Sequence, residues 1–334
     1  MNAQLNATQV FFYLPLILKP TVTPTTPPTL LASNQAHPDS LVVDSQAVYW
    51  ANCGTEVRAP TDGTILAFSK SQGISQTLAS GLSCPAFLKA DTDSLFWSNR
   101  QWNAGVVGRF TIFRIPKSGG QPVELASYEA INGSLAVDET YVYWRGYDGV
   151  VMRLPKTGGG TPEPAPVPAL VFDGPDAYWL NSSMDLIQSG KDGSSAVTLV
   201  RGSDLAKLGS LENSRVYITA IFPEPSEIYF TVFVDNYPGW LACRDQFTVL
   251  MKISKGGGEY GQVARVAGGA VTLVTEPFVY FSGYCTNGIL KITLNTQTVE
   301  TVVGWPESAW ALADDAIYVY WADWTNGWIK RVGK

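Results

Sequence analysis

Residues that could carry acid–base, redox or metal chemistry are scarce in this chain of 334 residues. His37 is the only histidine, so the commonest general base and metal ligand is missing from nearly the whole sequence. The sequence also contains no GxSxG elbow, no HExxH motif and no phosphate-binding P-loop. This pattern favours a protein that binds a partner over one that catalyses a reaction.

Carboxylates leave one enzymatic alternative open. Two carboxyl groups about 5–10 Å apart could hydrolyse a glycosidic bond between them. Asp residues that could serve in this way are Asp148, Asp235, Asp245 and Asp323. A glycan-acting hydrolase or lyase that uses these carboxylates is therefore the alternative function.

The four cysteines include no CxxC pair, which argues against zinc and dithiol redox chemistry. We expect two disulfides, Cys53–Cys84 and Cys243–Cys285, because the repeat described below brings the members of each pair to one face. Disulfides persist in oxidising compartments, so we expect a secreted or cell-surface protein. We expect no cofactor and no metal site, with a structural calcium ion as the open alternative even though no EF-hand-like spacing is present.

The net charge of −6 comes without a basic cluster that could neutralise a row of phosphates, which excludes a nucleic-acid partner. Residues 10–18 are apolar but are interrupted by Pro15 and are far shorter than the about 20 residues that a membrane-spanning helix needs. A segment rich in Pro and Thr follows. We therefore expect an apolar segment and linker over residues 1–28 and one folded domain over residues 29–334.

An internal repeat organises that domain. Aromatic elements such as "VYW" recur along the chain, and an acidic residue stands six positions before the last residue of most of them. The last residues of these elements, used as register marks, are Trp50, Trp97, Trp144, Trp179, Ile218, Phe281 and Trp321. The residues six positions earlier are Asp44, Asp91, Asp138, Asp173, Glu212, Thr275 and Asp315. We expect the five Trp residues to pack between repeats and the acids to stabilise tight turns.

Each copy of the repeat reads as four short antiparallel strands, and a Lys follows the third strand in most copies. Repeats of this length and strand content are typical of propeller blades. The sequence therefore predicts an all-β, seven-bladed β-propeller. The last copy ends before a fourth strand, and "TLLAS" at residues 29–33 matches the fourth strand of other copies. We predict that this segment pairs with the strand that contains Ile329 and closes the ring.

The segments "YWADWTNGWIKR" at 320–331 and "YWRGYDGVVMR" at 143–153 resemble the YWTD repeats of receptor propellers. That receptor family has six blades, whereas seven copies are counted here, so the resemblance implies the blade fold but not the ligands of the family. The pattern also resembles bacterial propellers with "VYW…G.V.R.PK.GG" repeats.

The loops between second and third strands differ from copy to copy, and the fifth copy carries what reads as a long insertion over residues 222–246. We expect these loops to form one face that binds a carbohydrate or a protein, because aromatic rings stack on sugars while Arg, Asn and Asp bind hydroxyl groups. A structural cell-surface protein that assembles through the N-terminal segment is a further alternative. The candidate binding residues are Arg100, Trp102, Arg145, Tyr147, Tyr237, Trp240, Arg244, Tyr284 and Trp324.

Overall fold

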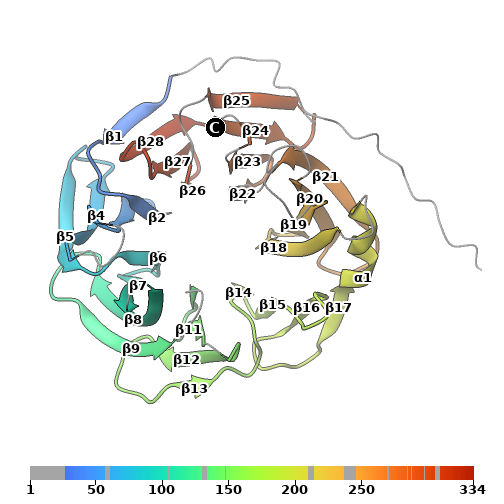
Figure 1. Cartoon of the computed structure of the whole chain (residues 1–334), viewed down its shortest axis with the longest axis horizontal. Coiled ribbons are helices and arrows are strands. Elements are labelled where there is room, and N and C mark those ends of the chain that lie inside the picture. Colours follow the sequence, from blue (N-terminus) through green and yellow to red (C-terminus); the bar gives the residue numbers. More distant parts are fainter. Residues whose placement is uncertain are drawn as a thin grey trace, which may run out of the picture.

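Seven four-stranded antiparallel sheets follow one another around a ring in the computed structural model (Figure 1). The structure describes residues 27–56, 61–103, 106–129, 134–146, 148–209, 214–236, 246–268, 271–283, 285–286, 288–296, 298–304 and 309–334. The predicted seven-bladed β-propeller is confirmed. In the first six blades the strand order in each sheet is the order in the chain, so that the first strand borders the central channel and the fourth lies outside.

The strands of the first three blades are β2 (Pro38–Val43), β3 (Ala47–Asn52), β4 (Gly63–Ser69) and β5 (Ser75–Leu82); β6 (Pro85–Ala90), β7 (Ser94–Asn103), β8 (Val106–Pro116) and β9 (Val123–Glu129); and β10 (Leu135–Val137), β11 (Tyr141–Arg145), β12 (Val151–Pro155) and β13 (Glu163–Pro164). The fourth blade holds β14 (Val171–Asp173), β15 (Asp176–Leu180), β16 (Leu186–Gly190) and β17 (Val197–Val200). A short helix, α1 (Gly202–Leu205), and a 3-10 turn, η1 (Ala206–Leu208), follow it.

The remaining blades hold β18 (Arg215–Pro223), β19 (Glu227–Asp235), β20 (Gln246–Ser254) and β21 (Tyr260–Ala267); β22 (Val271–Thr275), β23 (Phe278–Gly283), β24 (Gly288–Thr293) and β25 (Thr298–Gly304); and β26 (Ala311–Asp314), β27 (Tyr318–Asp323), β28 (Trp328–Gly333) and β1 (Thr29–Ala32). Strand β1 pairs with β28, and Ala32 lies opposite Ile329. The predicted closure of the last blade by the N-terminal strand is therefore confirmed.

The period of two along each aromatic strand explains how the blades pack. In β3, Trp50 enters a core shared with Tyr320 of the seventh blade, whereas Tyr49 points the other way, into a core shared with Trp97 of the second blade. Trp50, Trp97, Trp144 and Trp321 are almost fully buried, as predicted. Trp179 is only partly buried, against a smaller cluster that contains Ala169.

The fifth blade corrects two predictions. Ile218, taken as its register mark, lies on the first strand, β18, and the aromatic strand is β19 with Phe230 in the place of the tryptophan. The residue six positions before Phe230 is Glu224. The supposed insertion over residues 222–246 includes the end of β18 and the whole of β19, and residues 237–245 lie outside the described residues.

The recurring acids and lysines turn out to be partners. The Asp44 carboxylate accepts hydrogen bonds from the N–H groups of Gln46 and Ala47 through Oδ1, and its Oδ2 lies 2.6 Å from Nζ of Lys117 in the next blade. Thus one oxygen holds the turn, as predicted, and the other holds the neighbouring blade. Ion pairs that join neighbouring blades in this way are Lys70–Asp315, Lys117–Asp44, Lys156–Asp91, Lys191–Asp138 and Lys255–Asp173.

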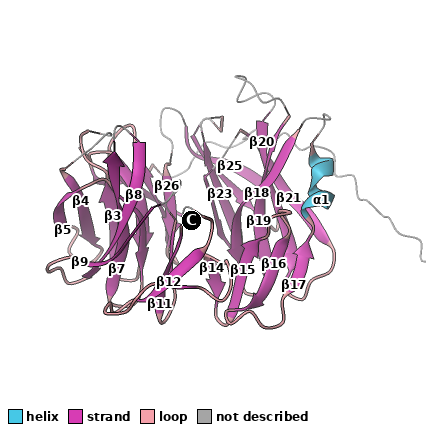
Figure 2. Ribbon diagram, turned by 60° about the horizontal axis from the view of Figure 1, so that its bottom comes forward, coloured by secondary structure: helices cyan, strands magenta, loops and turns pink. Residues whose placement is uncertain are grey.

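The turns with these ion pairs define what we call the ion-pair face. The connections between second and third strands, and those between consecutive blades, lie at the opposite face, which we call the loop face. The strands of each blade run between the two faces (Figure 2). An acid before the second strand and a lysine after the third strand lie at the same end of a blade of antiparallel strands, and the ion pairs show the two groups together there.

Loss of one inter-blade ion pair should weaken the ring in a pH-dependent way. Burial by itself raises the pKa of Asp44, but hydrogen bonds from Lys117, Ala47 and Gln46 outweigh it, so the pKa lies below its usual value. The stability that this carboxylate contributes is therefore present above its unfolded pKa of about 3.9 and is lost as pH falls through the folded value.

We predict that Lys117→Met lowers the free energy of unfolding at pH 7 by about 1.5–3 kcal/mol, the usual worth of a charged hydrogen bond. Denaturant unfolding should show that the difference from wild type shrinks as the pH approaches about 3.5. Lys207→Met, at an exposed lysine on η1, is the control. A difference that is the same at both pH values would contradict the proposed pairing.

Candidate functional site

A cluster of aromatic and charged side chains lies at the loop face where the seventh, first and second blades meet. It contains His37 from the connection between β1 and β2, Asp39 from β2, and Arg100 from β7. Trp310, just before β26, and Trp324, just after β27, complete it. All five side chains are held by contacts with one another or with the Cys53–Cys84 disulfide.

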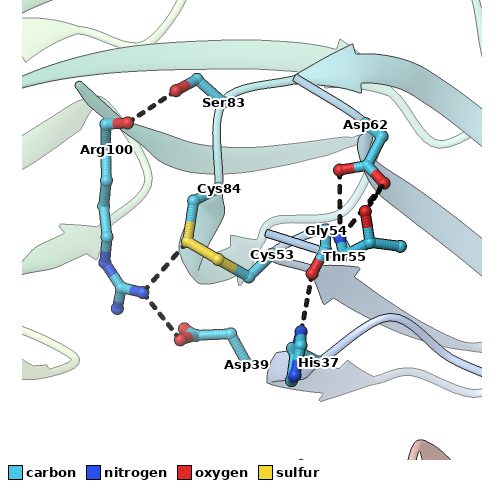
Figure 3. Close-up of a disulfide and its surroundings, with 9 residues drawn as sticks. All are labelled: His37, Asp39, Cys53, Gly54, Thr55, Asp62, Ser83, Cys84 and Arg100. Carbon is cyan, nitrogen blue, oxygen red and sulfur yellow. Dashed lines mark hydrogen bonds and ion pairs between the residues drawn. A yellow bond between two sulfur atoms is a disulfide. The ribbon is translucent and has the colours of Figure 1, made fainter. Parts of the chain in front are cut away.

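Hydrogen bonds and ring contacts link the five side chains and the disulfide into one cluster, and Figure 3 draws part of it. Nδ1 of His37 donates to the carbonyl of Gly54 at 2.7 Å, next to the disulfide. Nη1 of Arg100 lies 3.4 Å from Sγ of Cys84 and 2.9 Å from Oδ2 of Asp39. The predicted Cys53–Cys84 disulfide is thus confirmed, and it forms one side of the cluster.

The rings of Trp310, Trp324 and His37 pack on one another and complete the cluster. The ring of Trp310 packs on that of Trp324, with centroids 5.2 Å apart, and Trp324 packs on the His37 ring at 4.9 Å. Trp310 is 56% exposed, which makes it the most exposed aromatic side chain among the described residues. One side of its indole is therefore backed by Trp324 while much of the rest meets solvent.

In the charged pair of the cluster, the Asp39 carboxylate is buried and Arg100 is partly buried. The Asp39 side chain is only 6% exposed and that of Arg100 is 22% exposed. Burial raises the pKa of Asp39 above its usual value, although the charge of Arg100 and hydrogen bonds from Arg100 and Trp310 act in the opposite direction. Trp310 thus contacts both the Trp324 ring and the Asp39 carboxylate, and the two contacts orient the exposed indole.

Local structure positions each of these groups. His37 has a positive φ of 55°, a conformation held by the hydrogen bond from the Cys53 N–H to the His37 carbonyl. Gly327 approaches Gln35 so closely that a Cβ atom there would lie 2.4 Å from the Gln35 carbonyl oxygen. Only glycine fits this contact, which brings the turn that carries Trp324 against the segment that carries His37.

The start of the loop after β3 is also held in place. The N–H and hydroxyl groups of Thr55 donate to the Asp62 carboxylate, with the shortest contact, between oxygens, at 2.6 Å (Figure 3). These hydrogen bonds lower the pKa of Asp62. These hydrogen bonds therefore hold Thr55 and Asp62 together beside the disulfide.

The nine residues predicted to bind a ligand are only partly brought together. Arg100 and Trp324 lie in the cluster, whereas Arg145 donates to the carbonyls of Gly149 and Pro168 in its own neighbourhood. Trp102 lies on β7, and nothing further is described of its side chain. The candidates outside the described residues are Tyr147, Tyr237, Trp240, Arg244 and Tyr284.

The second predicted disulfide is described at one end. Cys285 is disulfide-bonded, and its predicted partner, Cys243, lies outside the described residues.

Two of the carboxylates considered for catalysis, Asp323 and Asp148, hold turns of the chain. Asp323 is fully buried, and both of its oxygens accept hydrogen bonds from Asn326. Asp148 caps its own turn by accepting from the N–H of Val150 at 3.0 Å. Asp235 lies at the end of β19, opposite Gln246, and Asp245 lies outside the described residues.

Trp310, His37 and Asp39 were missed as site residues. The predicted site residues belong to the loops between second and third strands, whereas Trp310, His37 and Asp39 lie in or next to the connections between blades. One available signal was Trp310 itself, a large aromatic residue five positions before the turn acid, where other copies have smaller residues, such as Pro168.

No family model matches the sequence, and no curated protein matches it. Among solved structures, the computationally designed Ika8 protein is 16% identical with a TM-score of 0.54, over 91% of this chain and 98% of that chain. The extracellular domain of a hybrid two component system from B. thetaiotaomicron is 10% identical with a TM-score of 0.58, over 89% of this chain but only 40% of that chain.

A catalytically inactive virginiamycin B lyase from Staphylococcus aureus, solved with quinupristin, is 13% identical with a TM-score of 0.50, over 92% of this chain and 98% of that chain. At these identities the similarities show the fold alone. The site must therefore be interpreted from its own side chains.

The buried ion pair should be essential for the geometry of the cluster. We predict that Arg100→Met lowers the free energy of unfolding by about 3–5 kcal/mol at pH 7, because it leaves the Asp39 carboxylate buried without a counter-charge. The loss should be smaller near pH 4, where Asp39 takes up a proton in this variant. Adding Asp39→Asn should recover most of the stability.

Arg145→Met provides the matched control, since this arginine donates only to backbone carbonyls at an exposed position. Denaturant unfolding of wild type and these three variants measures the effect. An Arg100→Met protein as stable as the Arg145→Met protein would show that the pair does not organise the cluster.

Proposed function

We propose that this propeller is a non-catalytic binding protein that takes a carbohydrate on its loop face, at the cluster around Trp310. The main support for this proposal is the half-exposed Trp310 indole, which contacts Trp324 and hydrogen-bonds to the Asp39 carboxylate. A fixed, exposed indole offers its face to the C–H groups of a sugar ring.

Pre-organisation makes such a site useful even when it is shallow. Trp310 and Trp324 are already held in place, so little side-chain freedom is lost when a ligand stacks on them. Because the charge of Arg100 is matched by Asp39, the platform presents no isolated charge next to the indole. The pairing of these two charges favours a neutral sugar over a strongly charged ligand.

A protein partner is the second candidate from the sequence, since exposed tryptophan also anchors protein interfaces. The hydrolase or lyase alternative finds less support, because Asp323 and Asp148 are engaged in their own turns. The alternative of a structural surface protein depends on the N-terminal segment, which lies outside the described residues.

The disulfides indicate the compartment in which the protein would meet such a ligand. Cys53, Cys84 and Cys285 are all disulfide-bonded, which fits an oxidising, non-cytoplasmic compartment. Among the described residues, no helix is long and apolar enough to cross a membrane. We therefore propose a secreted or cell-surface protein that meets glycans outside the cytoplasm.

A glycan array with the full-length protein tests the proposal. We predict binding to at least one neutral oligosaccharide and a loss of affinity of about tenfold or more for Trp310→Ala, which corresponds to about 1.4 kcal/mol. Adding Trp324→Ala should abolish binding. The melting temperature of Trp310→Ala should stay near that of wild type, because its side chain is largely outside the core.

Trp328→Ala is the matched control, because Trp328 lies in the same blade, on β28, and contacts Lys330 instead of the cluster. The proposal fails if no glycan binds, or if Trp310→Ala and Trp328→Ala bind equally well. If no glycan binds, capture of a protein by wild type but not by Trp310→Ala would support a protein partner instead.

A further inference from the structure

The imidazole of His37 carries a polar atom that is open to a ligand of the cluster. The ring packs on Trp324 with centroids 4.9 Å apart, and Trp324 packs in turn on the half-exposed Trp310. The imidazole therefore lies two ring contacts from the exposed indole, within the reach of a short oligosaccharide that stacks on it. His37 is also the only histidine in the chain, so its ring can be followed without interference from other imidazoles.

The hydrogen bond at Nδ1 fixes the tautomer of this ring. Nδ1 lies 2.7 Å from the carbonyl oxygen of Gly54, which can only accept a hydrogen bond, so Nδ1 carries the hydrogen atom (Figure 3). In the neutral ring the other nitrogen, Nε2, then keeps its lone pair and is an acceptor. The fold thus selects one of the two tautomers.

The Nε2 atom is unpaired and accessible. It has no hydrogen-bond partner among the described residues, because the Gly54 carbonyl is the one hydrogen-bonding contact of the ring there. The buried polar side-chain atoms without a partner do not include it, so solvent reaches it. A ligand hydroxyl group can therefore reach Nε2 and donate a hydrogen bond to it.

The backbone around His37 sets the direction of the ring. The His37 carbonyl accepts from the N–H of Cys53 at 2.9 Å, and the Ala36 carbonyl accepts from the N–H of Gly54 at 3.0 Å. One ring nitrogen is bonded to the same segment, and Trp324 packs against the ring. Because these contacts already orient Nε2, a ligand that binds there loses little freedom of the protein side chain.

We propose that His37 binds the ligand directly, with Nε2 accepting a hydrogen bond from a sugar hydroxyl group. This role rests on the proposed carbohydrate-binding function and adds a directional contact to the stacking on Trp310. Stacking alone accepts any ring with an apolar face, whereas the acceptor selects a neutral sugar with a hydroxyl group at one position. His37 is thus the residue that gives the site its specificity.

Two substitutions separate this role from a structural one. His37→Asn keeps a nitrogen donor at the δ position and suits the positive φ of 55°, but it removes the acceptor at the ε position. His37→Gln places an amide oxygen at the ε position, although Gln suits a positive φ less well than Asn. A structural role therefore predicts that the Asn variant binds better, and the proposed role predicts that the Gln variant does.

The probes are maltotriose, cellotriose and triacetylchitotriose, which are neutral oligosaccharides with different linkages or substituents. Calorimetry at pH 8 should show that His37→Asn lowers the affinity of the bound probe about three- to tenfold, the effect of removing one neutral hydrogen bond. His37→Gln should retain most of the affinity. A mono-deoxy analogue that lacks the bonded hydroxyl group should bind wild type and His37→Asn equally.

Nitrogen NMR of the single imidazole provides a measurement on the free protein. We expect hydrogen on Nδ1 at pH 8, and a shift of the Nε2 resonance when the bound probe is added. Hydrogen on Nε2 in the free protein would overturn the proposal.

Trp310→Ala distinguishes a failure of this role from a failure of the proposed function. If wild type binds a probe and Trp310→Ala loses affinity while His37→Asn does not, the site stands and the role of His37 is wrong. The role is also wrong if His37→Gln binds no better than His37→Asn. If wild type binds none of the probes, the neutral-sugar site and the role of His37 fail together.

Discussion

The ion pair between the turn acid of one blade and the lysine of the next is the contact on which the ring depends. It couples two levels of structure, because Oδ1 of Asp315, for example, accepts from the N–H groups of its own turn while Oδ2 meets Nζ of Lys70 at 2.5 Å. The hydrophobic packing of Trp and Tyr side chains is non-directional, whereas this contact fixes how each blade is placed against its neighbour. Together they determine the geometry of the ring.

The junction of the fifth and sixth blades lacks this ion pair. Leu294 stands where the other blades have lysine, and its N–H still donates to the carbonyl of Pro277. Glu224, the acid of the fifth blade, therefore has no lysine opposite, and burial, followed by the charges of Glu276 and Asp314, raises its pKa. A raised pKa means that ionisation of Glu224 costs stability near neutral pH. The hydroxyl of Tyr229 bonds to Glu276 at 2.7 Å and replaces part of the missing contact.

The closure of the ring also builds the candidate site. The N–H of Gln35 donates to the Gly327 carbonyl at 3.0 Å, and the indole N–H of Trp50 donates to the Gln35 side chain at 2.8 Å. These bonds join the chain segment that follows β1 to both the seventh and the first blade. His37 and Trp324 meet only because the N-terminal strand completes the last blade.

Much of the fold could be predicted from the repeat, because alternating aromatic strands and turn acids have local causes. The fifth blade was misassigned since "RVYIT" on β18 imitates the aromatic strand, and Glu212 happens to stand six positions before Ile218. Of the cluster, Arg100 and Trp324 could be predicted as rim residues. The size of Trp310 was a signal that could have been used, whereas the role of Asp39 could not be predicted, because it depends on how three blades and a disulfide converge, which no local pattern encodes.

We propose that the molecule is divided into a structural ion-pair face and a loop face that binds the ligand. Hydroxyl-radical footprinting of the full chain, with and without a saturating oligosaccharide, tests it most directly. We predict protection of Trp310, Trp324 and His37 and no change at the turns that carry Lys117 and Lys156. Protection of those turns, with unchanged oxidation of Trp310, would contradict the account.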